Sequence, residues 1–247
     1  MILIKNQDEI EQVRAACRVV AEVFREVEGE IKVGISTAEL DAKIEGSIRK
    51  LKAQPAFLGY RGYKHASCLS VNAEVVHGIP GSRRLAEGDI LGVDIGALLN
   101  GFYGDAARTY AIGPISRQAG QLLRAGQECL ELAIRQVRSG NHLGDISSVI
   151  ERHARKCGFS VVRDLFGHGI GRSLHEDPLI PNFGEAGAGA ELKPGMVLAI
   201  EPMLNAGGSQ VLTLSDGWTV VTADNQLSVH FEHTVLITEG DPEVLTK

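Results

Sequence analysis

Two aspartates flank a dipeptide that favours a tight turn, in the stretch LGVDIGALLNGFYGD at residues 91–105. Asn100-Gly101 readily adopts the two positive φ angles of a two-residue hairpin loop, and this loop pairs Asp94 with Ala107. Asp105 then lies diagonal to Asp94 on the same face, roughly 7–8 Å away at the backbone. Two carboxylates in apolar surroundings repel each other and lose hydration, so one interpretation is a cation between them, most simply a metal ion. The other is a pair of carboxylates on a solvated face, and the hairpin by itself leaves both open.

Three more segments place a potential metal ligand among glycines or apolar residues. His168 stands in LFGHGIG, where glycines let the backbone approach a site closely. A phosphate-binding loop is the competing interpretation there, but the GxxxxGK[ST] pattern is absent. Glu201 ends the apolar run MVLAIEP. Glu232 stands in the predicted strand SVHFEHTVLI, where an apolar residue would be less costly to bury.

These four carboxylates and one imidazole form a donor set for two divalent ions such as Mn, Fe, Co or Zn. Carboxylates that bridge such ions hold them about 3.5–4 Å apart, which is the arrangement used for metal-assisted hydrolysis. A water between the ions becomes a nucleophile near neutral pH. The residues therefore indicate a hydrolytic site.

Composition narrows the class of protein. The 247 residues are 44% hydrophobic and 23% charged, as in ordinary globular proteins, and the net charge of −6 argues against non-specific nucleic-acid binding. No apolar run approaches the ~20 residues of a membrane span, and charges near the N-terminus argue against a signal peptide. Cys17, Cys68, Cys129 and Cys157 form no CxxC pair, so we expect reduced thiols in a cytoplasmic protein.

Local patterns predict the elements that carry these residues. Apolar residues at helical spacing predict an amphipathic helix over 8–28, and Ser36 with Glu39 forms a capping-box pattern that opens a second helix. Alternating and apolar segments bounded by glycines predict strands over three further ranges: 66–76, 89–94 and 101–112.

The same order of elements recurs in the second half of the chain. EGDILGVD, which ends at Asp94, matches PGMVLAIE, which ends at Glu201, 107 residues later. Weaker helical matches recur at similar offsets. The repeat predicts one domain over 1–247 built from two duplicated halves, roughly 8–113 and 117–240, with Asp94 and Glu201 facing each other at their junction.

Five residues and their contexts carry a resemblance to a known family. Asp94, Asp105, His168, Glu201 and Glu232 stand in VDIG, GDAART, GHGIG, AIEPM and FEHT, and this set resembles type I methionine aminopeptidases. The resemblance spans nearly the whole chain. It implies an α/β (α+β) pita-bread fold, in which a curved antiparallel sheet is flanked by two helix pairs with internal pseudo-two-fold symmetry.

The resemblance also implies a role for each ligand. Asp105 and Glu232 bridge two divalent metal ions (Co, Mn, Fe or Zn), His168 and Glu201 complete one site, and Asp94 completes the other. Glu201 is in addition the implied general base, a role suited to a carboxylate that touches both metal and solvent.

Two histidines match the family's catalytic positions. His77, in VVHGIPG, matches the histidine near the scissile amide, and His175, in SLHEDP, matches the one that hydrogen-bonds the substrate carbonyl as it becomes an oxyanion. Without the resemblance, His77 and His175 could each be an ordinary polar side chain with no catalytic role.

A pocket for the leading methionine side chain follows from the same resemblance. Aromatic and sulfur-containing walls suit a polarisable thioether. The implied pocket residues are Tyr60, Tyr63, Cys68, His77 and Trp218.

Other matches are less complete. Phe57 stands beside the pocket at a position where bacterial members of the family often have a cysteine. Leu174 stands where they often have a phenylalanine. We expect these two differences to change the volume of the pocket. Asn72 and Ser228 match positions that hold a monovalent cation in some members.

The implied function is removal of the initiator methionine from new chains when the second residue is small. The implied partners are nascent polypeptide N-termini near the ribosome, with no nucleic acid or membrane, and the family implies a monomer. Two alternatives stay open. A Pro-directed peptidase shares the five ligands but usually carries a large N-terminal domain, and a pita-bread binding module that has lost catalysis usually loses ligands.

Overall fold

A computed structural model describes residues 1–247, and four long helices frame it. The helix predicted from residue 8 spans α1 (Gln7–Val27), and the capping box at Ser36 and Glu39 opens α2 (Thr37–Lys50), as predicted. The second helix pair consists of α3 (Arg117–Gln136) and α4 (Leu143–Lys156). Single turns of 3-10 helix lie at η1 (Glu28–Glu30) and η2 (Tyr60–Gly62). None of these helices is long and apolar enough to cross a membrane.

The strands form four small antiparallel sheets between the helix pairs. In the first, β4 (Ile90–Leu99) pairs with β1 (Gln54–Pro55), β2 (Ser67–Val71) and β5 (Phe102–Ala111). The second has the order β15-β14-β9-β7-β8, with these bounds: β7 (Phe166–Gly169), β8 (Glu176–Pro181), β9 (Val197–Ile200), β14 (His233–Leu236) and β15 (Glu243–Val244).

Two three-stranded sheets complete the strand layer. One has the order β13-β10-β6 and the other β11-β12-β3. Their strands have the following bounds: β3 (Glu74–Val76), β6 (Ser160–Val161), β10 (Met203–Asn205), β11 (Val211–Thr213), β12 (Val220–Thr222) and β13 (Ser228–His230).

The β4–β5 hairpin has the predicted register. Asp94 pairs with Ala107 and Gly96 pairs with Asp105, so the two aspartates lie on one face. Asn100 and Gly101 form the turn with φ angles of 52° and 78°, which are the left-handed values that this dipeptide favours.

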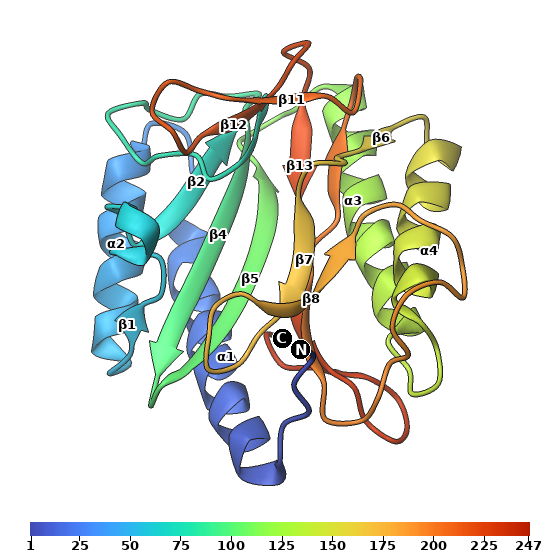
Figure 1. The fold of residues 1–247 in the computed structure, drawn as a ribbon. Helices are drawn as coiled ribbons and strands as arrows, with labels where there is room; N and C mark the ends of the chain where they lie inside the picture. Colours follow the sequence, from blue (N-terminus) through green and yellow to red (C-terminus); the bar gives the residue numbers. More distant parts are fainter.

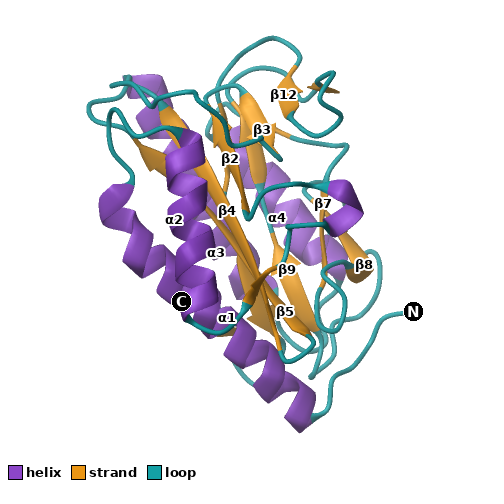
Figure 2. Ribbon diagram, turned by 90° about the vertical axis from the view of Figure 1, so that its left-hand side faces the viewer, coloured by secondary structure: helices purple, strands orange, loops and turns teal.

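Each helix pair packs on its own side of the strands (Figure 1). Figure 2 shows α1 and α2 running along the long strands β4 and β5, with which α1 is in contact. One apolar core lies under α1 and α2 and another under α3 and α4. The strands that carry the candidate ligands are therefore packed against the two helix pairs through these cores.

Hydrogen bonds join the two halves where their strands meet. Oγ1 of Thr234 donates to the carbonyl of Asp105 over 2.7 Å, and the backbone N–H of Glu232 donates to the carbonyl of Ala107 over 2.8 Å. Oγ1 of Thr109 donates to the carbonyl of His230 over 2.7 Å. These bonds set the distance between β5 and the C-terminal strands.

Three predicted strands differ from the observed ones. The strand over 66–76 is interrupted at Asn72, whose positive φ of 59° turns the chain between β2 and β3. The strand over 89–94 continues to residue 99, because the hairpin pairs along its full length. The sequence predicts one continuous strand around Glu232. In the structure the strand is interrupted at Phe231 and Glu232, and the two pieces, β13 and β14, belong to different sheets.

Candidate metal centre

A cavity of about 150 Å³ opens between the two halves, and it collects the predicted site residues. The predicted ligands, the two histidines and the pocket residues all line it: Phe57, Tyr60, Tyr63, Cys68, His77, Asp94, Asp105, His168, His175, Glu201, Trp218 and Glu232. Leu174 lines it as well. The structure thus places these residues at one site, while the role of each stays a prediction.

The candidate ligands come from both halves of the strand layer. Asp94 and Asp105 project from the β4–β5 hairpin. His168 lies on β7, Glu201 directly follows β9, and Glu232 lies in the break between β13 and β14. That break turns the Glu232 side chain out of a regular ladder and into the cavity.

Three of these side chains lie close enough to hold one ion. Asp105, His168 and Glu232 each offer a ligand atom, and these atoms lie within 4.8 Å of one another. The three residues are 5%, 3% and 2% exposed, so their polar atoms are removed from bulk water. Nδ1 of His168 lies 2.9 Å from the carbonyl of Gly169. Because a carbonyl only accepts, Nδ1 carries the hydrogen and Nε2 keeps a lone pair for a metal.

The carboxylates need a cation that the protein chain does not supply. Oδ1 of Asp94, Oδ1 of Asp105 and Oε1 of Glu232 are buried without any hydrogen-bond partner. Burial, reinforced by neighbouring carboxylates, raises the pKa of Asp94 to about 7 and holds the pKa values of Asp105 and Glu232 well above their usual range. Buried unpartnered oxygens and an imidazole lone pair around one cavity fit divalent metal ions.

Glu201 lies between two imidazoles. Its Oε1 is 3.6 Å from Nε2 of His168, and its Oε2 is 3.5 Å from Nε2 of His230. Its side chain retains 13% exposure, more than that of His168 at 4% or His230 at 5%. Glu201 can therefore contact both the buried cluster and water entering the cavity.

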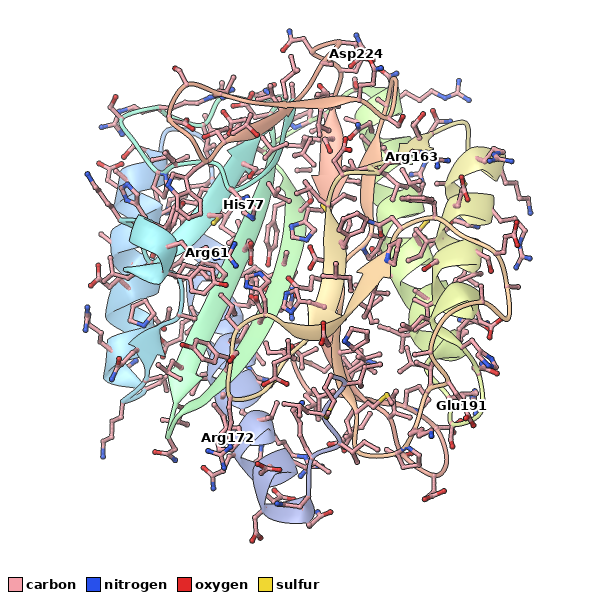
Figure 3. All side chains as sticks on the ribbon, viewed as in Figure 1. Arg61, His77, Arg163, Arg172, Glu191 and Asp224 are labelled. Atoms are coloured by element: carbon pink, nitrogen blue, oxygen red, sulfur yellow. The ribbon has the colours of Figure 1, made fainter.

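The two predicted catalytic histidines lie at the cavity wall. His77 follows β3, and its ring meets Trp218 edge to face with centroids 6.3 Å apart. Nδ1 of His175 lies 2.7 Å from the hydroxyl of Tyr60, and its ring centroid is 4.3 Å from that of His168. Figure 3 labels His77 and Arg61 in the part of the view where β2 and β4 are drawn. Burial lowers the pKa of His77, and burial with the neighbouring His168 lowers the pKa of His175 to about 4, so both are neutral at pH 7.

Aromatic rings form the pocket wall. Tyr63 meets Trp218 in an edge-on contact with centroids 5.0 Å apart. Phe57 is buried against β4, where a Cβ atom added to Gly96 would lie only 2.6 Å from its Cε1. Gly96 therefore makes room for the phenyl ring of Phe57.

Two polar residues of the cavity, besides the apolar Val76, are not predicted from the sequence. His230 lines the cavity with an unpartnered buried Nε2, and Arg61 lies at the cavity mouth against the ring of Tyr60. His230 stands two positions before Glu232, so alternation along a strand could have indicated it. No signal in the sequence indicates Arg61, because a backbone turn with a positive φ of 48° sets its direction.

The two predicted monovalent-cation residues lie outside the cavity lining. The N–H of Ser228 donates to the carbonyl of Asn72 over 2.9 Å, so the residues are neighbours. Their side chains bind elsewhere, Asn72 to Asp89 and Ser228 to Asn205. The cation at this position stays a prediction.

Comparison with known proteins agrees with this geometry. The sequence profile of metallopeptidase family M24 matches residues 11–239. The methionine aminopeptidase of Clostridium perfringens is 49% identical over 246 residues, which cover 100% of this chain and 99% of that protein. Methionine aminopeptidase 1 of Bacillus subtilis is 49% identical over 247 residues and is covered completely.

Solved structures extend the comparison. The crystal structure of methionine aminopeptidase from Thermotoga maritima superimposes with a TM-score of 0.98 at 48% identity, with 100% of each chain covered. Prolidase from Pyrococcus furiosus has a TM-score of 0.81 at 26% identity, with 99% of this chain and 65% of that chain covered. The pita-bread fold, with two helix pairs around antiparallel strands, is therefore confirmed.

Proposed function

The chain belongs to metallopeptidase family M24 as a methionine aminopeptidase, and we propose that it removes the initiator methionine from polypeptides whose second residue is small. One observation carries the proposal. The buried cluster of Asp105, His168 and Glu232 opens into the same cavity as the aromatic wall of Tyr63 and Trp218. A hydrolytic centre and an apolar side-chain pocket are thus adjacent.

Two divalent metal ions complete the proposed centre. Asp105 and Glu232 would be the shared ligands, His168 and Glu201 would complete one site, and Asp94 would complete the other. The unpartnered oxygens of the three buried carboxylates support this assignment. When bound, such ions lower the pKa of water and polarise a carbonyl group.

The protein's own residues direct the proton and orient the substrate. Glu201 accepts the proton of the attacking water and returns it to the leaving amine nitrogen as the carbon–nitrogen bond breaks. His175 is neutral at pH 7, and Tyr60 can donate to its Nδ1. Nε2 then carries a hydrogen that can be donated to the carbonyl oxygen as negative charge develops there.

The pocket supports selection of a methionine side chain. Cys68, Phe57 and Trp218 present sulfur and aromatic surfaces, which suit a flexible thioether. His77 lies beside Trp218, where it can contact the scissile amide. A cavity of about 150 Å³ leaves limited space beyond that side chain, which supports a small second residue.

Peptide hydrolysis with defined metals tests the proposal. We expect metal-stripped protein to release methionine from Met-Ala-Ser only after Mn²⁺, Co²⁺, Fe²⁺ or Zn²⁺ is restored, and to cleave a Met-Leu-Ser peptide much more slowly. Cleavage of Ala-Pro-Ala alone would favour a Pro-directed peptidase such as the structurally similar prolidase. Metal binding without cleavage of any of these peptides would favour a binding module.

The cellular setting is part of the same proposal. We propose a monomer that acts in the cytoplasm on nascent N-termini near the ribosome, without nucleic acid or membrane as its target. Size-exclusion chromatography with light scattering tests the oligomeric state. Cosedimentation with translating ribosomes, compared with empty ribosomes, tests the nascent-chain partner.

A further inference from the structure

We propose that Glu128, His153 and Cys157 form a second metal site, on the surface of the α3–α4 helix pair, that takes one divalent ion of borderline softness such as Zn²⁺. None of the three residues lines the catalytic cavity. They lie on the second helix pair, beside the strand layer (Figure 1). The proposed site is thus separate from the hydrolytic centre in both position and donor chemistry.

Helix geometry brings the three side chains together. His153 lies in the last turn of α4, and Cys157 caps that helix four positions later, so the two project from the same face. The N–H of Cys157 donates to the carbonyl of His153 over 3.0 Å, which fixes this spacing. Glu128 reaches them from α3, which packs against α4.

Two partners converge on one imidazole nitrogen. Nε2 of His153 lies 2.8 Å from Oε2 of Glu128 and 3.6 Å from Sγ of Cys157. A ring nitrogen has either one hydrogen or one lone pair, so it cannot form a full hydrogen bond with both neighbours at once. A cation at the centre of these three atoms could be coordinated by all of them.

The distances suit tetrahedral zinc. Zn–N bonds of about 2.0–2.1 Å and Zn–S bonds of about 2.3 Å give an N···S edge of about 3.5–3.6 Å, which matches the contact between His153 and Cys157. The corresponding N···O edge is about 3.3–3.4 Å, so the Glu128 carboxylate would withdraw by roughly half an ångström. Glu128 is exposed and can make that movement without disturbing the core.

The donor set also selects the kind of ion. One thiolate, one imidazole and one carboxylate favour Zn²⁺ over Mg²⁺ or Ca²⁺, which prefer oxygen ligands. On binding, the Cys157 thiol releases its proton to solvent, and the thiolate and carboxylate together neutralise the two charges of the ion. A surface hollow of about 220 Å³, lined by Glu128 and Cys157, leaves room for a water as the fourth ligand.

Alkylation of Cys157 provides a readout that does not depend on catalysis. Cys157 is exposed, whereas the other cysteines are buried, so iodoacetamide reaches it in the folded protein. We expect Zn²⁺ to slow alkylation of Cys157 by at least about tenfold, measured by mass spectrometry of its peptide. The His153→Ala and Glu128→Gln variants are expected to lose most of this protection, and Glu131→Gln, a matched change on the same helix, is expected to keep it.

Cobalt spectroscopy provides a second readout. Co²⁺ added to the wild-type enzyme is expected to give a thiolate-to-cobalt absorption band that the Cys157→Ser variant lacks. Hydrolysis of Met-Ala-Ser by each variant, at a metal level that saturates the wild type, checks that the fold is intact. Equal Zn²⁺ protection in the wild type and His153→Ala, or a cobalt spectrum unchanged in Cys157→Ser, would overturn the proposal.

Discussion

Nε2 of His230 lies 3.5 Å from Oε2 of Glu201, on the side of that carboxylate opposite His168. The contact joins the end of β13 to the residue that follows β9. At this distance it is a close contact and not a hydrogen bond, and it places the imidazole ring of His230 beside the Glu201 carboxylate.

Removal of this contact is expected to reduce turnover more than substrate binding. In His230→Ala, Glu201 loses a neighbour that orients it, so we expect kcat to fall about 10–100-fold with a smaller change in KM. His230→Gln retains a polar group at a similar position and is expected to recover much of the loss. Steady-state kinetics on Met-Ala-Ser measures both variants, and a loss confined to KM would contradict the positioning role.

His168→Ala is expected to abolish turnover, by at least about 100-fold, while the protein remains folded. The substitution removes one proposed ligand, but the pairing of β7 with β8 and β9 is formed by backbone groups and remains. Metal content by mass spectrometry is expected to fall as well, and circular dichroism monitors the fold. Activity close to that of the wild type would refute the proposed role of His168 as a ligand.

The contribution of Asp94, Asp105 and Glu232 to the stability of the metal-free protein is expected to decrease as pH rises from 5 to 7. The folded-state pKa of Asp94 is raised to about 7 from 3.8, so the unfolded chain loses this proton at a lower pH than the folded chain does. Asp105 and Glu232 act in the same direction. His77 and His175, whose pKa values are lowered, act in the opposite direction, so the carboxylate contribution is measured as a difference between variants. Each kcal/mol lost lowers Tm by about 2–4 °C in a domain of this size.

Divalent metal is expected to reverse this trend, because metal ions bind the deprotonated carboxylates and bind more tightly as pH rises. Differential scanning fluorimetry with a chelator and with Mn²⁺ measures both curves. Asp94→Asn is expected to flatten the metal-free curve. The same pH dependence of Tm in metal-free wild type and metal-free Asp94→Asn would count against Asp94 as a cause.

A buried ion pair holds the segment that carries His175. Nζ of Lys5 lies 3.0 Å from Oε2 of Glu176, and the two side chains are 6% and 7% exposed. Lys5→Met leaves Glu176 buried without its partner, so we expect the free energy of unfolding to fall by about 3–5 kcal/mol. Urea denaturation measures the change.

An exposed ion pair offers the control for that experiment. Lys50 pairs with Glu26 over 2.7 Å but is 70% exposed, so Lys50→Met is expected to cost less than about 1 kcal/mol. The double variant Lys5→Met, Glu176→Gln is expected to recover part of the loss by removing the unpaired charge. Equal effects of Lys5→Met and Lys50→Met would show that burial of the first pair has no energetic consequence.

Phe57→Cys is expected to change substrate selectivity more than the pH profile. The phenyl ring occupies space over Gly96 at the cavity wall, and a cysteine would vacate part of it. We expect the kcat/KM ratio between peptides with small and bulky side chains at the first or second position to change about tenfold. An unchanged substrate spectrum would place Phe57 outside the specificity pocket.

The sequence by itself determined the elements whose causes are local. Asn100-Gly101 specified the turn, and with it the register that places Asp94 opposite Ala107, because two adjacent residues supplied both positive φ angles. Ser36 and Glu39 specified the start of α2 through their own hydrogen bonds. The five ligand contexts indicated the family because each ligand keeps its own short motif.

Tertiary structure decided what depends on contacts between distant segments. Glu232 was expected within a continuous strand, but its flanking segments join different sheets, and this break turns the carboxylate toward Asp105. The contact between His230 and Glu201 follows from the pairing of β13 with β10, in which His230 lies opposite Met203. Local patterns cannot show it, because it depends on the pairing of segments distant in the sequence.

The surface cluster of Glu128, His153 and Cys157 also depends partly on local sequence and partly on tertiary packing. The spacing of His153 and Cys157 can be read from the chain, since helix periodicity alone aligns them. The approach of Glu128 requires α3 to pack against α4 in one particular rotation. Local backbone preferences therefore determined which residues point the same way, and packing between elements distant in the sequence determined which of them meet.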